Sequence, residues 1–278
     1  MRGQVMKRNF KKAVIGEAKK DNRQNKERLK YLFKQKYNKS KEYEFPKSAD
    51  IDMNRFFFFP KFDKDFSISL PSIAIYPVLC LHSDFEHKNW FQISQKNIAK
   101  MAGIDVNTVR KGIKDLENNS IIGEPILQKR KQTEGTRHFY VYETNFIRKD
   151  NIEEWEGEYI TFHKCIIDSG VWADLKPRSK ALYLSMRMSA HFDAELYIEI
   201  EGLALDYATK DIYEVVKGSN YMNRKWDVCN IPLTELCKKV NIAPTNLKPL
   251  IVQLEEHRLI ERIDENKSVF MVYLKPKI

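Results

Sequence analysis

Apolar residues between Ile93 and Ile122 recur at three- and four-residue spacing in two groups, first Ile98, Ala99 and Ala102, then Val109, Ile113 and Leu116. Such spacing predicts two short amphipathic helices. Ser94 suits the N-cap of the first helix, Gly103 suits its end, and Asp105 or Asn107 can cap the second. Two helices joined by a tight turn containing glycine indicate a helix-turn-helix.

The flanking patterns extend this unit on both sides. A strand is predicted over Phe56–Phe59, and an apolar helix begins at Leu70, with Pro77 expected to kink or shorten it. Two β-rich runs follow the helix-turn-helix, and the turn between them contains Gly135; the runs are Ile126–Gln132 and His138–Glu143. Helix, helix-turn-helix and hairpin in this order are typical of a winged-helix domain.

The same order of patterns occurs a second time. Ile231–Ile260 aligns without gaps on Ile93–Ile122, and this alignment pairs Ile121 with Leu259. Ala181-Leu182-Tyr183 aligns on Ala74-Ile75-Tyr76, but at a smaller offset in numbering. The second copy therefore holds extra sequence between its first helix and its helix-turn-helix. This difference predicts an insertion at about residues 193–227.

Charge is unevenly distributed along the chain. The formal charge is +10, from 48 Lys and Arg against 38 Asp and Glu. Residues 1–41 hold 15 of the basic residues and only three acidic ones, which leaves 33 basic and 35 acidic residues in the remainder. Residues 1–48 therefore predict a basic, flexible arm, with a helix over about 19–36 that needs a partner to be stable. The predicted fold class is mainly helical α+β: this arm, a first winged-helix domain at 49–148 and a second at 149–278.

Several functional classes are not expected. No apolar run reaches the length of a membrane span, and the basic N-terminus lacks the apolar stretch of a signal peptide, so we expect no membrane association and a cytoplasmic location. Four scattered cysteines predict buried, reduced thiols. Neither a phosphate-binding loop nor a paired-histidine nicking motif occurs. We therefore expect no enzymatic activity, no cofactor and no metal.

The tandem arrangement resembles plasmid and phage replication initiator proteins built from two winged helices. The resemblance is carried by "PSIAIYPVL", "GVWADLKPRSKALYLSM" and "QKNIAKMAGIDVNTVRKGIKDLENNSII" and covers roughly residues 50–278. It implies binding to repeated origin sites on double-stranded DNA and recruitment of replication proteins. The helix-turn-helix alone also resembles bacterial transcription regulators.

Candidate DNA contacts lie mainly in the first copy. The second helix of a helix-turn-helix lies in the major groove, where Asn pairs with adenine and Arg with guanine, whereas Lys favours phosphates. From the start of the first helix, the outward side of the second helix and the hairpin, we select Ser94, Gln95, Asn107, Thr108, Arg110, Lys111, Lys114, Lys129, Arg130, Lys131 and Arg137.

The second copy has fewer features that favour DNA binding. Its candidate contacts are Thr245, Asn246 and Lys248, but Pro249 is expected to break the helix or force its start to about Lys248. Its hairpin turn, Asp264–Lys267, is partly acidic. The second copy is therefore expected to bind DNA weakly or to contact protein, and two equal readers are the alternative.

Three functional hypotheses remain at this point. The first is a sequence-specific replication initiator of a plasmid or phage-like element. The second is a winged-helix transcription regulator, for which the insertion is the only candidate effector or dimerisation segment. The third is a scaffold that loads a helicase or primase and touches DNA through its arm. Partners under these hypotheses are double-stranded DNA, a host helicase or primase, and a second copy of the chain.

Overall fold

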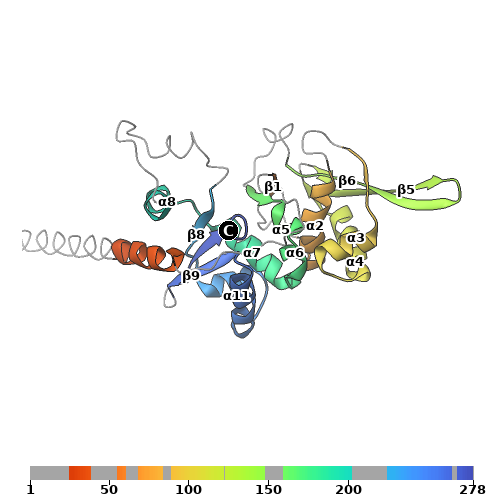
Figure 1. Cartoon of the computed structure of the whole chain (residues 1–278). Helices are drawn as coiled ribbons and strands as arrows, with labels where there is room; N and C mark the ends of the chain where they lie inside the picture. The colour runs from red at the N-terminus through yellow and green to blue at the C-terminus, as the bar shows by residue number, and fades with distance from the viewer. Residues whose placement is uncertain are drawn as a thin grey trace, which may run out of the picture.

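The computed structural model describes residues 25–38, 55–60, 68–83, 89–121, 123–147, 159–201, 224–264 and 268–277. It is a mixed α+β structure, as the sequence predicts, in which helices and small antiparallel sheets alternate (Figure 1). We call residues 55–147 the first half and residues 159–277 the second half.

The first half contains a three-helix unit with a three-stranded sheet. Its elements, in chain order, are α2 (Leu70–His82), β2 (Phe91–Gln92), α3 (Gln95–Ala102), α4 (Val106–Asn118), β5 (Leu127–Glu134) and β6 (Arg137–Thr144). The sheet is antiparallel in the order β2-β6-β5, so the last strand lies in the middle.

The second half repeats this order. Its elements are α7 (Pro177–Ser189), α8 (Ala194–Glu201), β8 (Trp226–Cys229), α10 (Leu233–Lys239), the 3-10 turn η3 (Pro244–Asn246), α11 (Leu247–Glu256), β9 (Ile260–Asp264) and β10 (Val269–Tyr273). The sheet order β8-β10-β9 again places the last strand in the middle. α8 is the extra element, and it lies within the predicted insertion.

Equivalent side chains make equivalent bonds in the two halves. Tyr76 of α2 donates its hydroxyl proton to the carbonyl of Asn145 at 3.0 Å, and Tyr183 of α7 donates to that of Tyr273 at 2.8 Å. Both tyrosines are buried, and each is the seventh residue of its helix. α2 and α7 have 13 residues each, so the two helices correspond from end to end.

A second equivalence is a pair of hydrogen bonds in each half, which join α4 to the start of α2 and α11 to the start of α7. Asp115 accepts the Ser69 N–H at 2.9 Å and the Ser72 hydroxyl at 2.5 Å. At the corresponding positions, Gln253 accepts the Lys176 N–H at 3.2 Å and the Ser179 hydroxyl at 2.6 Å. These bonds satisfy donors that a helix N-terminus otherwise leaves unpaired. The match extends the predicted repeat to side-chain detail.

The structure corrects the gap-free alignment after α4. A small hairpin, β3 (Ser120–Ile121) with β4 (Glu124–Pro125), occurs in the first half before β5. The carbonyl of Ile126 accepts the Asn145 N–H at 2.8 Å, as that of Leu259 accepts the Tyr273 N–H at 2.9 Å. Leu259 therefore corresponds to Ile126 and not to Ile121.

Of the two outcomes expected for Pro77, a kink or a shortened helix, shortening of α2 does not occur. The helix continues to His82, and Ser72–Leu81 are all buried. Packing on every side offsets the backbone hydrogen bond that proline removes.

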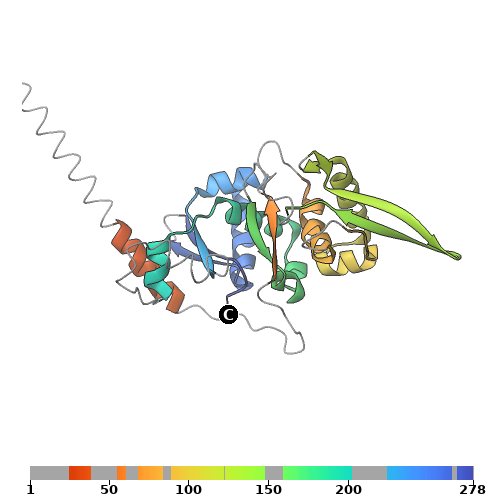
Figure 2. The same cartoon turned by 90° about the horizontal axis from the view of Figure 1, so that it is seen from above.

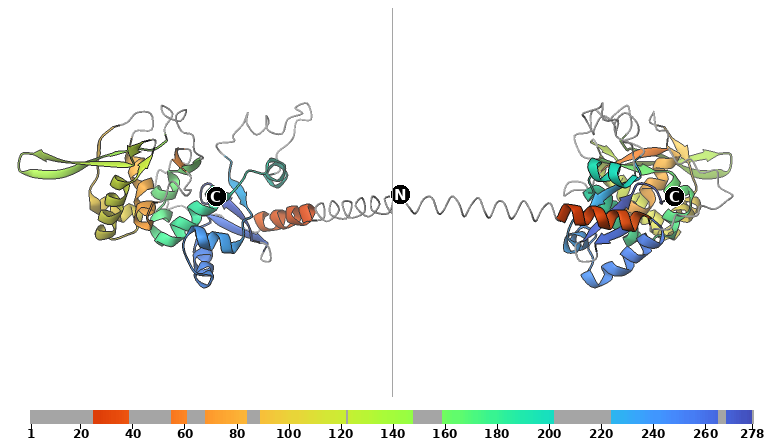
Figure 3. Two further views of the ribbon diagram at one scale, coloured as in Figure 1. Left: turned by 180° about the vertical axis from the view of Figure 1, so that it is seen from behind. Right: turned by 60° about the vertical axis from the view of Figure 1, so that its left-hand side comes forward.

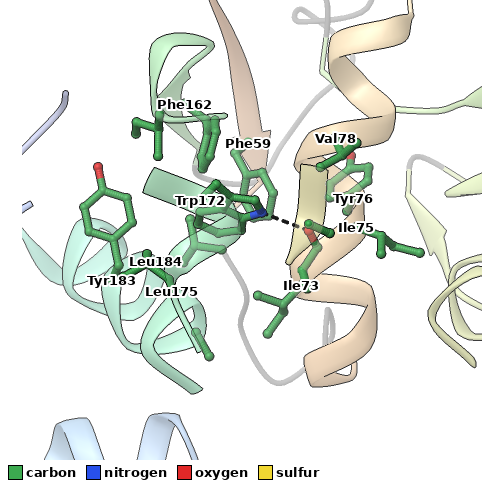
Figure 4. Packing of buried hydrophobic residues seen from close by; sticks show 14 of the residues in the cluster. Phe59, Ile73, Ile75, Tyr76, Val78, Phe162, Trp172, Leu175, Tyr183 and Leu184 are labelled. Atoms are coloured by element: carbon green, nitrogen blue, oxygen red, sulfur yellow. Dashed lines mark hydrogen bonds between the residues drawn. The ribbon is translucent and has the colours of Figure 1, made fainter. Parts of the chain in front are cut away.

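The two halves share a junction and a core. β1 (Phe56–Pro60) of the first half pairs antiparallel with β7 (Tyr159–His163) of the second, so the two predicted aromatic strands pair with each other. The short helices α5 (Cys165–Asp168) and α6 (Val171–Asp174) follow β7, and Trp172 donates its indole N–H to the carbonyl of Ala74 at 2.9 Å. Figure 4 shows this bond among aromatic and aliphatic side chains from both halves, which belong to one continuous cluster.

Part of the basic N-terminal segment is ordered against the second half. Residues 25–38 form a helix, here called the N-terminal helix, whose Phe33 is 1% exposed (Figure 3). The helix predicted over about 19–36 is thus present where the structure describes this segment, and these residues pack on the second half; residues 1–24 and 39–48 lie outside the described part. The predicted need for a partner is met by α8 and the sheet of the second half.

Candidate nucleic-acid interface

The helix-turn-helix of the first half is fixed by its caps. Ser94 accepts the N–H of Asn97 at 3.1 Å, and Asp105 accepts that of Thr108 at 2.9 Å, so Asp105 and not Asn107 is the N-cap of α4. Gly103 between them has φ +62°, and a Cβ there would collide with the carbonyl oxygen of Ala173 in the second half. Only glycine satisfies both the left-handed turn and this close approach.

α4 has one buried face and one exposed face. Val109, Ile113 and Leu116 are buried, as predicted, and Gly112 allows the helix to approach the backbone of Pro71 closely. The opposite face is exposed and carries Asn107, Arg110, Lys111 and Lys114. The outward position predicted for these four side chains is confirmed.

Arg110 is held in place by its neighbours on this face. Its Nε donates to Gln95 Oε1 at 3.2 Å, and its Nη1 donates to Asn107 Oδ1 at 3.0 Å. These two bonds leave other guanidinium N–H groups for a ligand. Gln95 therefore supports Arg110, and its own contact with DNA stays a prediction.

Thr108 is less available than predicted. It is half-buried, and its hydroxyl donates to Asp105 Oδ2 at 2.5 Å. The bonds from the hydroxyl and N–H of Thr108 hold the pKa of Asp105 below its ordinary value. Thr108 thus stabilises the start of α4, and its base contact remains a prediction.

Each carboxylate of α4 and its cap is already bonded within the protein. Asp105 caps α4, Asp115 caps α2, and Glu117 pairs with Lys129 of β5 at 3.1 Å. Burial acts to raise the pKa of Asp115, but bonds from Ser72 and Ser69 outweigh it and the pKa is lowered. Asp115 therefore stays ionised, and the exposed face of α4 carries the cations.

The hairpin β5–β6 projects well beyond the body of the protein (Figures 1 and 2). Its two-residue turn, Gly135-Thr136, uses Gly135 with φ +58°, which the turns of tight hairpins require. Side chains alternate between the two sides. Lys131 lies opposite Tyr140, on the side of the hairpin that also carries Lys129.

The four hairpin cations selected from the sequence are spread along its length. Lys129 is engaged by Glu117, and Arg130 lies on the other side with its guanidinium 4.1 Å from the ring centre of Trp90. Lys131 and Arg137 are exposed and form no ion pair with any described residue. Lys131 and Arg137 are thus the hairpin cations most available to a ligand.

Sequence reasoning missed two aromatic side chains at this surface. Trp90 supports Arg130 by a cation–π contact, and Tyr140 is 42% exposed beside Lys131. Strand alternation places Tyr140 on the same side as Lys129 and Lys131, a signal that was present in the sequence.

The corresponding surface of the second half has different chemistry. At the positions of Arg110, Lys111 and Lys114, α11 carries Lys248, Pro249 and a 41% exposed Val252. Thr245 and Asn246 are exposed in η3. α11 begins at Leu247, one residue from the start that Pro249 predicted.

The turn of the second hairpin falls largely outside the described residues, which end at Asp264 and resume at 268. Asp264 itself is buried, and its Oδ2 lies 3.2 Å from Nη2 of Arg28 in the N-terminal helix. It is therefore a structural acid and not a surface charge of the turn.

The cysteines are placed as predicted. All four cysteines are buried and free, and burial raises the pKa of Cys165 to about 12. Within the described ranges, no three His, Cys, Asp or Glu side chains are placed to hold a metal. The same residues include no helix with the length and apolar character needed to cross a membrane.

No protein-family model, curated protein or solved structure matches this chain, so the residues of the α4 and β5–β6 surface carry the functional argument.

Proposed function

We propose that the chain consists of two tandem winged-helix domains that bind double-stranded DNA sequence-specifically. The observation that carries the proposal is the surface of α4. Its cations Arg110, Lys111 and Lys114 are exposed, whereas the nearby carboxylates are all bonded internally. Such a face, which carries cations and no carboxylate, attracts phosphates.

In the proposed complex α4 enters the major groove. Asn107 and Arg110 lie on its N-terminal turns, where side chains reach base edges, and Arg110 is oriented toward guanine by Gln95. Lys111 and Lys114 contact phosphates, and the hairpin follows the backbone with Lys131 and Arg137. Ser94 reaches a phosphate from the start of α3.

The second half is proposed to contribute less to DNA affinity. Pro249 and Val252 replace two cations on α11, so Thr245, Asn246 and Lys248 make at most minor contacts. Its shared core and the β1–β7 pair hold the first half in a fixed position. It acts mainly as a rigid support and as a surface for other proteins.

The biological role proposed is initiation of replication on a plasmid or phage-like element. The tandem arrangement supports this role. The transcription-regulator alternative is less favoured, because the insertion is its only candidate effector or dimerisation segment, and α8, within that insertion, packs against the N-terminal helix of the same chain. Footprinting at low salt on the DNA that flanks the gene tests the proposal. Protected repeats are expected, and uniform cleavage across the region contradicts it.

The scaffold alternative is tested by shortening the arm. Removal of residues 1–24 keeps the N-terminal helix, whereas removal of 1–48 also uncovers the apolar surface around Trp226. Retained site-specific binding by the 49–278 chain excludes a scaffold that contacts DNA only through its arm, whereas retention by the 25–278 chain excludes only a scaffold that uses residues 1–24. Loss of site-specific binding supports that scaffold.

A further inference from the structure

The outer face of the second-half sheet, turned away from α10 and α11, is apolar and is covered by two helices. Trp226, Val228, Ile263, Val269, Met271 and Tyr273 contribute to it. α8 and the N-terminal helix pack on these side chains, and Figure 3 shows the N-terminal helix beside the strands. The cover therefore joins two segments that lie far apart in the sequence.

The N-terminal helix has a single deeply buried anchor. Phe33 stacks on Trp226 with ring centres 5.9 Å apart, and Tyr197 of α8 packs on the same indole at 5.0 Å. Leu29, Leu32 and Tyr37 are only partly buried. One buried aromatic ring on so short a helix provides limited apolar attachment.

Charge pairs, together with hydrogen bonds from Lys277 and Lys225 to Tyr37, supply the rest of the attachment. Lys26 and Lys30, one helical turn apart, meet Glu195 and Glu199, which are one turn apart on α8, at 2.6 and 2.8 Å. Arg28 lies 3.2 Å from Asp264. The hydrogen bond and charge of Glu195 raise the pKa of Lys26, and those of Glu199 raise the pKa of Lys30.

The Lys26–Glu195 pair is exposed enough to be exchanged for other anions, whereas the Lys30 side chain is 21% exposed and Asp264 is buried. The Lys26 and Glu195 side chains are each more than half exposed, and exposed ion pairs are weak and screened by salt. DNA presents a dense row of phosphates to which the same three cations can bind. Lys34 and Lys36, exposed on the same helix, add to that attraction.

We propose that the N-terminal helix is a reversible cover of the apolar face around Trp226, which phosphates of bound DNA draw away from the second half. The DNA-dependent step rests on the proposed function. The cover itself rests only on the described contacts. The occupant of the face in the DNA-free protein is the N-terminal helix of the same chain.

Hydrogen exchange of the full chain tests this inference. A random-sequence duplex at low salt is expected to accelerate amide exchange about tenfold in residues 25–38 and to accelerate it in α8 as well. Exchange in α2 serves as the internal reference. Unchanged or slower exchange in 25–38, with the duplex shown to be bound by fluorescence anisotropy, overturns the proposal.

A matched pair of variants isolates the charge pairs. Glu199→Lys is expected to release the helix without DNA, whereas Glu256→Lys, on α11 and exposed, leaves its exchange unchanged. Equal behaviour of the two variants argues against a charge-held cover. A salt titration of the unmodified chain gives the same information without a substitution, because screening should accelerate exchange selectively in 25–38.

Heparin separates failure of the cover from failure of DNA binding. If the duplex does not bind at all, the proposed function fails. The cover then stands only if heparin accelerates exchange in residues 25–38, and it fails if heparin leaves that exchange unchanged.

Discussion

The outer faces of the two sheets differ although the sheets share one topology. When the paired strands are aligned, Arg130 and Glu143 of the first half stand where the second half has Ile263 and Met271. Arg130 is exposed and Glu143 half-exposed, whereas Ile263 and Met271 are buried under α8 and the N-terminal helix. The composition of one sheet face thus decides whether a repeat unit needs an additional cover.

The largest expected effect on stability comes from giving the outer sheet face of the second half a charged side chain like that of the first half. Met271→Glu buries a carboxylate without a partner and should lower the free energy of unfolding by about 4 kcal/mol or more. The reverse change, Glu143→Met, should alter it by less than about 1 kcal/mol. Urea unfolding measures both, and similar losses in the two variants would show that the faces do not differ energetically.

The turn of the helix-turn-helix gives the next comparison. Gly103→Ala combines a left-handed backbone with a collision against Ala173 and should destabilise the protein by about 2–4 kcal/mol. Asn241, at the corresponding position of the second half, has φ +50°. Asn241→Ala should cost only about 1 kcal/mol. Equal losses in thermal unfolding would mean that contact with Ala173 is unimportant.

The first helices of the two halves, α2 and α7, differ by one buried lysine. Lys180 of α7 occupies the position of Ile73, donates to the carbonyl of Leu175 and lies over Trp172, and burial lowers its pKa to about 7. Between pH 7 and its ordinary pKa of 10.5, the unfolded chain retains a proton that the folded chain has lost. Stability from this group therefore rises with pH across that window and is lowest below it.

Lys180→Ile should remove this pH dependence and stabilise the protein by about 1–3 kcal/mol at pH 6, with a smaller gain at pH 9. Urea unfolding at both pH values measures the effect. Arg178→Ile, at the exposed neighbouring position, is the control and should show no such difference. A gain that is the same at pH 6 and pH 9 would contradict a neutral buried Lys180.

α4 and α11, the helices proposed to contact DNA, provide a binding comparison. Arg110→Ala should weaken binding to the preferred DNA site by about 1–3 kcal/mol and relax its sequence preference, whereas Lys248→Ala should change affinity by less than about 0.5 kcal/mol. Fluorescence anisotropy with specific and scrambled duplexes measures both. A larger loss from Lys248→Ala would favour two equal readers.

The smallest expected change is a loss of DNA affinity in variants of the β5–β6 hairpin. Lys131→Ala should weaken binding to all sequences alike and reduce the slope of log K against log salt by about 0.9, because one phosphate contact is lost. Lys129→Ala should change the slope less, since Glu117 already neutralises Lys129. Equal slopes for Lys131→Ala and the unmodified chain would place the hairpin away from DNA.

Much of the helical framework could be predicted from local sequence. Ser94 and Gly103 bound α3 as expected, and the buried face of α4 follows from the spacing of Val109, Ile113 and Leu116. These features depend on neighbours within a few residues, which sequence spacing reports directly. The same reasoning placed the Pro249 distortion within one residue of the start of α11.

Features that depend on distant partners were not predictable in this way. Neither the Glu117–Lys129 pair nor the Arg130–Trp90 contact follows from cation counting, although both remove cations from the proposed interface. The β3–β4 hairpin shifted the alignment, from Ile121 to Ile126 opposite Leu259, because equivalence is defined by strand pairing and not by spacing.

The sequence by itself determined the repeated order of elements, the buried and exposed faces of α4, and the concentration of basic residues near the N-terminus. Hydrophobic spacing and charge composition are local properties that the chain carries in any conformation. Only the tertiary structure decided that Phe33 packs on Trp226, that β1 pairs with β7, and which cations remain available. These outcomes depend on side chains that are distant in the sequence, whose proximity is set by packing of the complete core.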